Sequence, residues 1–460
     1  MQSLFLEIYD KSINYINETA VYMAKDGDKN VLVITGPNAA GFKAEDIGSG
    51  KFKAELTHEN ACLIRKLFPW TVPVRGLQKF KSFGLGDRLG IATPGHIDLF
   101  KTNDVFPVFA QQSIRELNLT NRTYEDVLDA ATFAVFREGY KKGYGADGDH
   151  LKIAKDVEYA LSLGFTIITL DCSDYIKSDA AIDNAEPLSQ DYIDKYLSEE
   201  FDIEGIPLVF TKEELSLCVA IYKDAISFAA EIYSTFFKTG KYDADLEISI
   251  DETAFPTTPL QHYFVARELL DRGVIFTTLA PRFCGEFQKG IDYIGDKTQF
   301  ENDIKIHAAI SRSLGYKLSI HSGSDKFSIF PIIGKQTRGN YHVKTAGTNW
   351  LEAMRVIASV DVILYREIHN YALSVFNEAK KYYQVTADVS KIPDVSAIKD
   401  EDLPGLFENN DVRQLIHITY GFILNNKSFK DRLFKLLYKH ENEYRSSLVK
   451  HIGKHLELLN

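Results

Sequence analysis

The stretch DLEISIDETAFPTTPLQHYFVARELLDRGVIFTTLAPRF, from Asp245 to Phe283, contains the pattern on which the fold prediction rests. A short apolar run, DLEISI, ends in the polar pair Asp251 and Glu252, and a second run, GVIFTTLAP, ends at Arg282. Between them, PLQHYFVARELLDRG carries apolar residues at three- and four-residue spacing and stops at Gly273, as a helix does. The stretch therefore predicts a strand, a crossover helix and a second, parallel strand.

The same unit recurs along the chain. Eight apolar or β-branched runs end in polar residues, and helical patterns lie between several of them: KFKSFGLGD (79–87), DVFPVFAQQ (104–112), KKGYGADGDHLK (141–152), GFTIITLDCSD (164–174), DLEISIDET (245–253), GVIFTTLAPRF (273–283), YKLSIHSGSDK (316–326) and NYHVKTAG (340–347). Eight units over roughly 260 residues predict a (β/α)8 TIM barrel, which takes about 250. The alternative, a doubly wound open sheet, would not usually need eight strands that all end in polar residues.

Two regions fall outside the predicted barrel. We expect residues 1–75 to form a small mixed N-terminal cap, 76–356 the barrel, and 357–460 a helical C-terminal extension. The final segment, from SFKDRLFKLLYKH to the end, has an apolar stripe that predicts a helix packed on the outside of the barrel, with a subunit contact or a lid as the alternative. The insertion at 175–215 is long and acidic and could cover the mouth of the pocket.

Composition narrows the class of protein. The chain has 460 residues and a formal net charge of -11, which argues against a nucleic-acid partner. Its four scattered cysteines form no CxxC pair and fit a reducing compartment. The sequence contains no uncharged apolar stretch of about 18 residues, so we expect no membrane span. The first residues do not resemble a signal peptide. We therefore expect a cytoplasmic protein that acts on a small molecule, while a homo-oligomer stays open.

The chemistry of such a barrel lies at the C-terminal ends of its strands. Asp171 and Glu252 end the fourth and fifth runs and are the expected catalytic carboxylates. The alternative is that each caps the following helix, and beside Glu252 the neighbouring Asp251 could cap instead.

Two histidines are the expected metal ligands. His321 ends the seventh run, and strand alternation places His342 on the same face as Lys344 in the eighth. That face should point into the pocket, because a lysine is costly to bury against the helices. Imidazoles and carboxylates from different strands predict a divalent-metal site, with Asp171 as a further candidate ligand and zinc, manganese, iron or nickel as the ion. For a single histidine, a structural role is the alternative.

Further polar residues at the strand ends are expected to bind substrate: Gln111, Asp149, His150, Lys152, Arg282 and Lys344. Positive charge for an anionic substrate could come from several cations, each of which could instead be a solvated surface charge: Arg88, Arg282, Lys152, Lys326 and Lys344. ITGPNAAGF, at Ile34–Phe42, looks like a phosphate loop but lacks the Lys-Ser/Thr ending and the dinucleotide spacing, so it does not predict nucleotide binding.

Eight segments resemble the tagaturonate epimerase family: KSFGLGDRLGIATPGH (81–96), FAQQSIREL (109–117), GYGADGDHLK (143–152), TLDCSDYI (169–176), IDETAFPTTPLQHYF (250–264), LAPRFCGEFQKGIDYIGD (279–296), SIHSGSDKFSIFPIIGK (319–335) and YHVKTAGTNWLEAMRVIA (341–358). The resemblance implies interconversion of D-tagaturonate and D-fructuronate with a divalent metal, although some relatives act on the neutral pair tagatose and fructose. It implies that Asp171 and Glu252 look like the acid–base pair and that His321 and His342 look like metal ligands. It leaves open whether Asp171 is a base or a ligand.

The reaction that the resemblance implies constrains the mechanism. The inverted carbon lies one position beyond the carbon next to the ketone, so proton removal beside the carbonyl would invert the wrong centre. A retro-aldol cleavage and reclosure solves this, whereas a hydride shift would call for a nicotinamide, for which no binding fingerprint is present. The competing hypotheses are a metal-dependent barrel aldolase or lyase of keto sugars or keto acids, and a non-catalytic carbohydrate-binding barrel.

Overall fold

The computed structural model describes residues 6–36, 39, 41–177 and 187–460. Its centre is a closed barrel of parallel strands in the order β10-β13-β14-β15-β16-β7-β8-β9. The strands are β7 (Lys81–Leu85), β8 (Phe106–Ser113), β9 (Gly145–Leu151), β10 (Ile167–Asp171), β13 (Asp245–Ile250), β14 (Thr278–Pro281), β15 (Lys317–Ile320) and β16 (Tyr341–Thr345). Each predicted run supplies one of these strands. Because β16 pairs with β7 and β9 pairs with β10, the barrel closes, which confirms the (β/α)8 fold class and excludes the open sheet.

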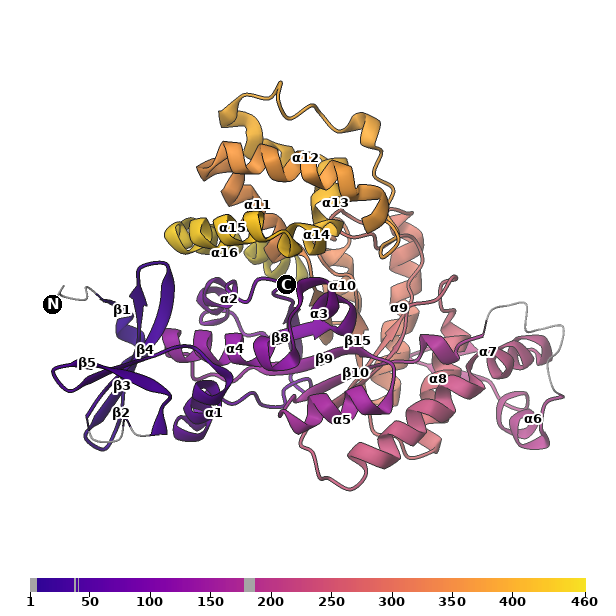
Figure 1. Ribbon diagram of the computed structural model, residues 1–460. Coiled ribbons are helices and arrows are strands. Elements are labelled where there is room, and N and C mark those ends of the chain that lie inside the picture. Colours follow the sequence, from indigo (N-terminus) through magenta and orange to yellow (C-terminus); the bar gives the residue numbers. More distant parts are fainter. Residues whose placement is uncertain (1–5, 37–38, 40, 178–186) are drawn as a thin grey trace.

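Helices surround the barrel and connect its strands (Figure 1). They are α2 (Thr93–Phe100), α3 (Ile114–Thr120), α4 (Tyr124–Glu138), α5 (Ala154–Ser162), α7 (Lys212–Ile232), α8 (Pro259–Asp271), α9 (Lys297–Leu314), α10 (Phe330–Gln336) and α11 (Thr348–Val360). Local chemistry sets their ends: Thr123, Thr211 and Thr258 each begin a helix with a capping box. Gly139 and Gly315 end helices in the left-handed conformation that glycine adopts without strain.

An antiparallel sheet forms the N-terminal cap, on the left of Figure 1. It contains β1 (Glu7–Ile8), β2 (Asn14–Ile16), β3 (Thr19–Asp26), β4 (Lys29–Thr35), β5 (Ala44–Gly48) and β6 (Lys51–Ala54), followed by α1 (His58–Leu67). Its buried face packs with α1 and with Phe133 and Phe136 of α4, which joins the cap to the barrel. The segment Ile34–Phe42 leaves β4, and its residues 37, 38 and 40 lie outside the described residues.

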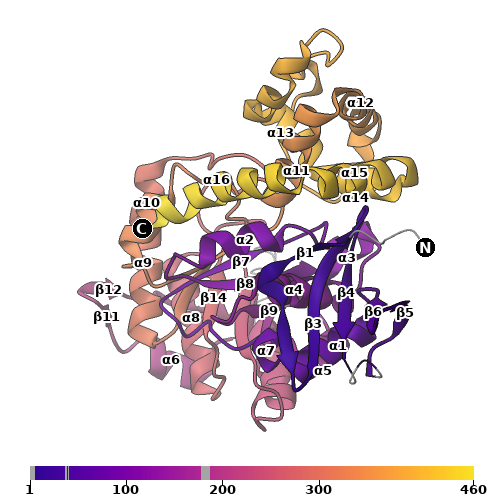
Figure 2. The same ribbon diagram turned by 90° about the vertical axis from the view of Figure 1, so that its left-hand side faces the viewer.

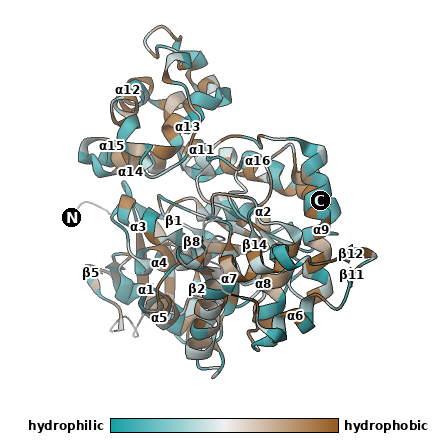
Figure 3. Cartoon of the chain, turned by 90° about the vertical axis from the view of Figure 1, so that its right-hand side faces the viewer, coloured by the Kyte–Doolittle hydropathy of each residue, from teal (hydrophilic) through white to brown (hydrophobic). Residues whose placement is uncertain are grey.

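The C-terminal extension is helical, as expected. It comprises α12 (Val362–Ala379), α13 (Asn410–Ile418), α14 (Tyr420–Asn425), α15 (Lys427–Lys439) and α16 (Glu441–Leu459). Figure 2 shows α16 lying along the barrel beside α2 and α10. Close approach needs glycine at Gly334 of α10, where a Cβ would lie 2.3 Å from the carbonyl oxygen of Leu459. The tail therefore packs on the outside of the barrel. Both apolar and polar residues are present along these helices (Figure 3), as expected when each helix buries one face.

The insertion between β10 and α7 contains α6 (Gln190–Tyr196) and a hairpin of β11 (Phe201–Ile203) and β12 (Ile206–Leu208). Its described part is attached to the outer helices, since Lys195 pairs with Glu268 of α8 and Glu204 pairs with Arg312 of α9. The prediction that this insertion covers the pocket does not hold for residues 187–215, and residues 178–186 lie outside the described part. Within the described residues, no helix is long and apolar enough to cross a membrane.

Candidate active site

A cavity of about 290 Å³ opens at the C-terminal ends of the barrel strands. Its walls come from residues that end or follow β8, β9, β13, β14, β15 and β16. Tyr382, Tyr383 and Gln384, which follow α12, close one side, so the C-terminal extension contributes to the cavity. The size suits a small molecule rather than a polymer.

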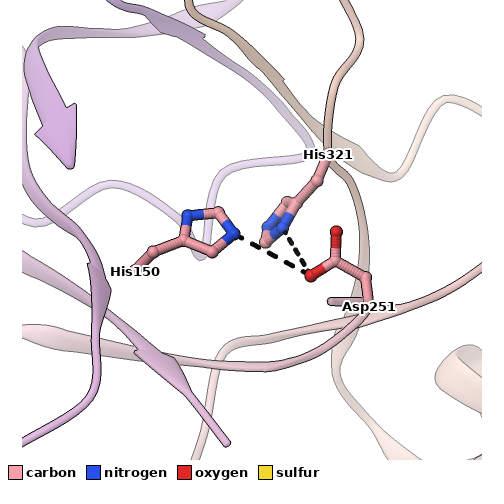
Figure 4. A group of neighbouring side chains, drawn as sticks. All are labelled: His150, Asp251 and His321. Atoms are coloured by element: carbon pink, nitrogen blue, oxygen red, sulfur yellow. Dashed lines mark hydrogen bonds and ion pairs between the residues drawn. The ribbon is translucent and has the colours of Figure 1, made fainter. Parts of the chain in front are cut away.

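Three side chains converge on one point of this cavity: His150 from β9, Asp251 after β13 and His321 after β15 (Figure 4). Their nearest ligand atoms all lie within 4.8 Å of one another. Asp251 Oδ1 is 3.2 Å from His321 Nδ1 and 3.8 Å from His150 Nε2. Two imidazoles and a carboxylate are a ligand set that zinc, manganese and iron accept, with positions left for a substrate.

Each histidine is held from behind by a second carboxylate. Asp149 Oδ1 lies 2.7 Å from His150 Nδ1, and Glu247 Oε1 lies 2.7 Å from His321 Nε2. In metal sites such carboxylates fix the orientation and the tautomer of the ligating rings. The arrangement therefore leaves one nitrogen of each ring directed toward Asp251.

Lys344 links the supporting carboxylates at the centre of the barrel. Its Nζ lies 2.5 Å from Asp149 Oδ1, 2.7 Å from Asp147 Oδ2 and 3.4 Å from Glu247 Oε1. Burial opposes the charge of this lysine, but the carboxylates raise its pKa above its usual range. Burial also raises the pKa of Asp147 to about 6. Lys344 thus stabilises the layer that positions the two histidines.

The charges of the cluster depend on each other. Burial favours the neutral forms of the two imidazoles, but Asp149 raises the pKa of His150 well above its usual value, and Asp251 raises that of His321. In turn, burial alone would raise the pKa of Asp251, and His321 and His150 hold it well below the usual range. A metal bound here would displace protons from the rings, so its affinity would fall in acid.

The backbone is strained at two of these strand ends. His150 has a φ of +55° and Ser322, next to His321, has a φ of +50°. The left-handed region costs about 1–3 kcal/mol for residues other than glycine, and such strain collects at functional sites. The tertiary structure therefore maintains an unfavourable local conformation at this point.

The structure brings together several predicted site residues but leaves three of them, His342, Asp171 and Lys152, outside the cavity. The residues that line the cavity are Gln111, Asp149, His150, Glu252, Arg282, His321 and Lys344. His342 is fully buried below the cavity, where its Nδ1 lies 2.9 Å from Ser82 Oγ and burial lowers its pKa to about 3. Asp171 is also fully buried and accepts a hydrogen bond from the Ser173 N–H, with Lys152 Nζ 3.6 Å away. The expected set of His321, His342 and Asp171 is therefore not the set that converges.

Sequence reasoning missed Asp251, which it considered only as a helix cap. Strand alternation could have found it, because Glu247, Ser249 and Asp251 share one face of β13 and its continuation, as His342 and Lys344 do in β16. Glu252 is the next residue, so alternation directs its side chain to the opposite face. It lines the rim of the cavity, with its side chain 38% exposed and its Oε1 3.7 Å from Arg115 Nη2.

The other predicted substrate-binding residues differ in their availability. Gln111 donates a hydrogen bond to the Thr345 carbonyl, while its Oε1 has no partner among the described residues. Arg282 donates to the Thr253 carbonyl. Lys152 does not line the cavity and pairs with Asp174 at 2.7 Å.

Two of the predicted cations, Lys326 and Arg88, already bind other groups of the protein. Lys326 Nζ donates to the carbonyls of Gln288, Ile291 and Ser324 and does not line the cavity. Arg88 lines the cavity, but it is buried against Glu116 at 2.8 Å.

Comparisons with known proteins agree along nearly the whole chain. A family model described as tagaturonate epimerase matches residues 9–459. A tagaturonate/fructuronate epimerase from Thermotoga maritima is 46% identical over 468 aligned residues, 98% of this chain and 97% of the relative. The crystal structure of a fructuronate-tagaturonate epimerase from Cohnella laeviribosi, complexed with one glycerol, is 45% identical, covers 99% of this chain and 96% of its own, and superposes with a TM-score of 0.96. The native crystal structure of that protein superposes equally well. The chain therefore belongs to the tagaturonate epimerase family and is an isomerase of the epimerase type.

Proposed function

We propose that this protein interconverts D-tagaturonate and D-fructuronate, as the names of its relatives describe for them. The observation that carries the proposal is the convergence of His150, Asp251 and His321 in the cavity at the barrel mouth. A non-catalytic sugar-binding barrel would have no need for two histidines each oriented by its own buried carboxylate.

A divalent cation, such as zinc, manganese, iron or nickel, fits this cluster. The donor set is chemically suitable, the donor atoms lie within 4.8 Å of one another, and Asp149 and Glu247 support the two rings. We assign the ligands as His150, Asp251 and His321. When bound there, the cation would polarise the ketone and the neighbouring hydroxyl of the substrate and would stabilise negative charge on them.

The inversion proceeds by retro-aldol cleavage and reclosure. A base takes the proton from the hydroxyl on the inverting carbon, and the adjacent carbon–carbon bond breaks to give an aldehyde and an enediolate. The aldehyde turns, the bond re-forms on its other face, and the proton returns to the new hydroxyl. Both fragments stay in the cavity, which Tyr382, Tyr383 and Gln384 cover on one side.

Glu252 is the residue that we assign to this proton transfer. It lines the cavity beside Asp251, and its partial exposure leaves its carboxylate accessible to a bound substrate. Its Oε1 lies 3.7 Å from Arg115 Nη2. Asp171 is less suited to direct transfer, because its side chain is fully buried and does not line the cavity.

One experiment tests the function and the route together. The protein is treated with chelator, supplied with one divalent metal at a time, and incubated with D-tagaturonate or D-tagatose before sugar chromatography. We expect D-fructuronate as the single product and no activity without metal. Two shorter products would instead identify a lyase, and full activity in chelator would refute the metal. Wholesale deuterium incorporation at the inverting carbon from heavy water would exclude the retro-aldol route.

A further inference from the structure

The cavity contains cationic side chains that fall into two groups. Those that line it are Arg88, Arg115, Arg282, Lys289 and Lys344. An anionic substrate would bind best to the cations that the protein itself leaves unsatisfied, since a satisfied cation must first give up its partners. The partners of each side chain therefore decide where an anion can bind.

Three of these cations are already engaged. Arg88 bonds Glu116 at 2.8 Å and lies 3.7 Å from the centre of the Tyr420 ring. Lys344 lies among the buried carboxylates that support the histidines. Arg282 donates to a backbone carbonyl and faces Glu286. A substrate could use these groups only at the expense of existing contacts.

Arg115 and Lys289 are different. Lys289 Nζ donates to Ser322 Oγ at 2.9 Å, and no carboxylate of the described chain lies within 4.0 Å of it. Among the described residues, the ion pair of Arg115 is a loose one, with Glu252 at 3.7 Å, and its guanidinium lies 5.0 Å from the centre of the Tyr383 ring. Both residues line the same cavity.

We propose that Arg115 and Lys289 form the subsite for the carboxylate of the substrate, which makes the protein selective for keto-uronates over neutral ketoses. This inference rests on the proposed function. A guanidinium binds a carboxylate through two parallel hydrogen bonds, and an ammonium adds a compact charge beside it. Among the described residues, Lys289 has no anionic partner within 4.0 Å and Arg115 has only its loose pair with Glu252, so an added carboxylate would satisfy both charges.

The position of this subsite agrees with the order of groups along the substrate. In a keto-uronate, the inverting carbon lies between the ketone end and the carboxylate end. In the cavity, Glu252 follows Asp251 directly in the chain and lies 3.7 Å from Arg115. Glu252 is thus next in the chain to one member of the cluster and near Arg115, which agrees with that order.

Selectivity follows from desolvation. A neutral ketose would present a hydroxymethyl group to Arg115 and Lys289, which would leave Lys289 without an anionic partner and Arg115 with only its loose pair to Glu252. A site built to bind one polar group rejects an analogue that lacks it much more strongly than an apolar pocket rejects a small change. We therefore expect a lower KM for a substrate that carries the carboxylate than for a neutral ketose that lacks it.

The test compares Arg115→Met, Lys289→Met and the double variant with wild type on D-tagaturonate and on D-tagatose, with D-tagatose followed as a competitor if it is not turned over. We expect each single variant to raise the KM for D-tagaturonate about 10- to 100-fold, the range for a hydrogen bond to a charged group. The preference for D-tagaturonate over D-tagatose should fall by a similar factor, and Arg115→Lys should restore part of it. Arg338→Met and Lys335→Met, two exposed residues outside the cavity, are the matched controls.

The two proposals fail in distinguishable ways. If wild type does not convert D-tagaturonate, the proposed function is wrong. If wild type converts it and the double variant, folded by its melting temperature, keeps a KM within twofold of wild type, the carboxylate subsite is wrong. An equal loss of D-tagaturonate and D-tagatose binding would also overturn the subsite, because it would indicate general positioning rather than recognition of charge.

Discussion

Two clusters of histidine and carboxylate side chains in this molecule look equally able to bind a metal: His150 with Asp251 and His321, and Asp325 with His451 and His455. The first lies in the cavity, and the second joins the loop after β15 to α16. In each cluster the possible ligand atoms lie within 4.8 Å of one another. What separates them is how many of those atoms are already used.

In the second cluster the nitrogens have partners within the protein. His455 Nε2 accepts a hydrogen bond from the Asp325 N–H at 3.0 Å, and its Nδ1 bonds the His451 carbonyl at 2.9 Å. His451 lies between Asp325 at 2.5 Å and Glu352 at 3.2 Å, while Arg413 takes the other Asp325 oxygen at 2.8 Å. This group is a buried clasp that ties the C-terminal helix to a barrel loop.

In the first cluster each ring has only one nitrogen held by a supporting carboxylate. The other nitrogen of each ring points toward Asp251 Oδ1, at 3.2 and 3.8 Å. The two clusters therefore share residue types and distances, but only in the first do the ligand atoms lie in a cavity with one ring nitrogen of each histidine left for an ion.

The largest effect is expected from the first cluster itself. His321→Ala should lower turnover by at least about 10³-fold, because losing the ion removes several kcal/mol of transition-state stabilisation. Metal content by elemental analysis should fall with it. His451→Gln is the matched control, and its metal content should equal that of wild type. A loss of metal in His451→Gln but not in His321→Ala would reverse our assignment of the two clusters.

Glu252→Gln distinguishes the role proposed for Glu252, proton transfer, from that proposed for the neighbouring Asp251, metal binding. Turnover should fall by about 10²-fold or more, as for a lost general base, while metal content stays at the wild-type level. Asp251→Asn should lower both. If Glu252→Gln retains full turnover, the proton-transfer assignment is wrong.

A smaller effect is expected from the layer behind the ligands. Asp149→Asn removes the carboxylate that orients His150 and should weaken metal binding by about 10- to 100-fold without abolishing it. Titration of the chelator-treated protein with metal measures this directly. An unchanged affinity would mean that Asp149 serves only to stabilise Lys344.

The smallest effect concerns the pH dependence of the clasp. Burial opposes the charge of His451, but Asp325 raises its pKa, so the charged pair contributes stability that is fully present below the unfolded pKa of about 6.5 and is lost as the pH rises through the folded pKa. His451→Gln should therefore lower the free energy of unfolding by about 1–3 kcal/mol at pH 6 and by less at pH 9. Denaturant unfolding at both values, with metal present, checks this. A larger loss at pH 9 would contradict the charged clasp.

The fold was predictable because its signals are local. Each of the eight runs, such as DLEISI before Asp251, carries its own strand pattern and polar end, and eight such units with crossover helices have one common architecture. The direction of side chains into the barrel was also predictable from strand alternation, as for His342 and Lys344, which both lie inside the barrel.

The barrel, the strand ends at its mouth, and the places of His150, His321 and Glu252 there all follow from the amino-acid pattern. Depth in the barrel follows from three-dimensional packing alone: His342 and His321 both face inward, but His342 is fully buried below the cavity. Packing also determines which ionisable groups remain available, since the carboxylates around Lys344 come from β9 and β13, and the N–H that binds His455 Nε2 comes from the loop after β15. The physical reason is that side-chain direction follows from the local backbone, whereas the height of a residue in the barrel and its partners depend on the stagger and packing of distant segments.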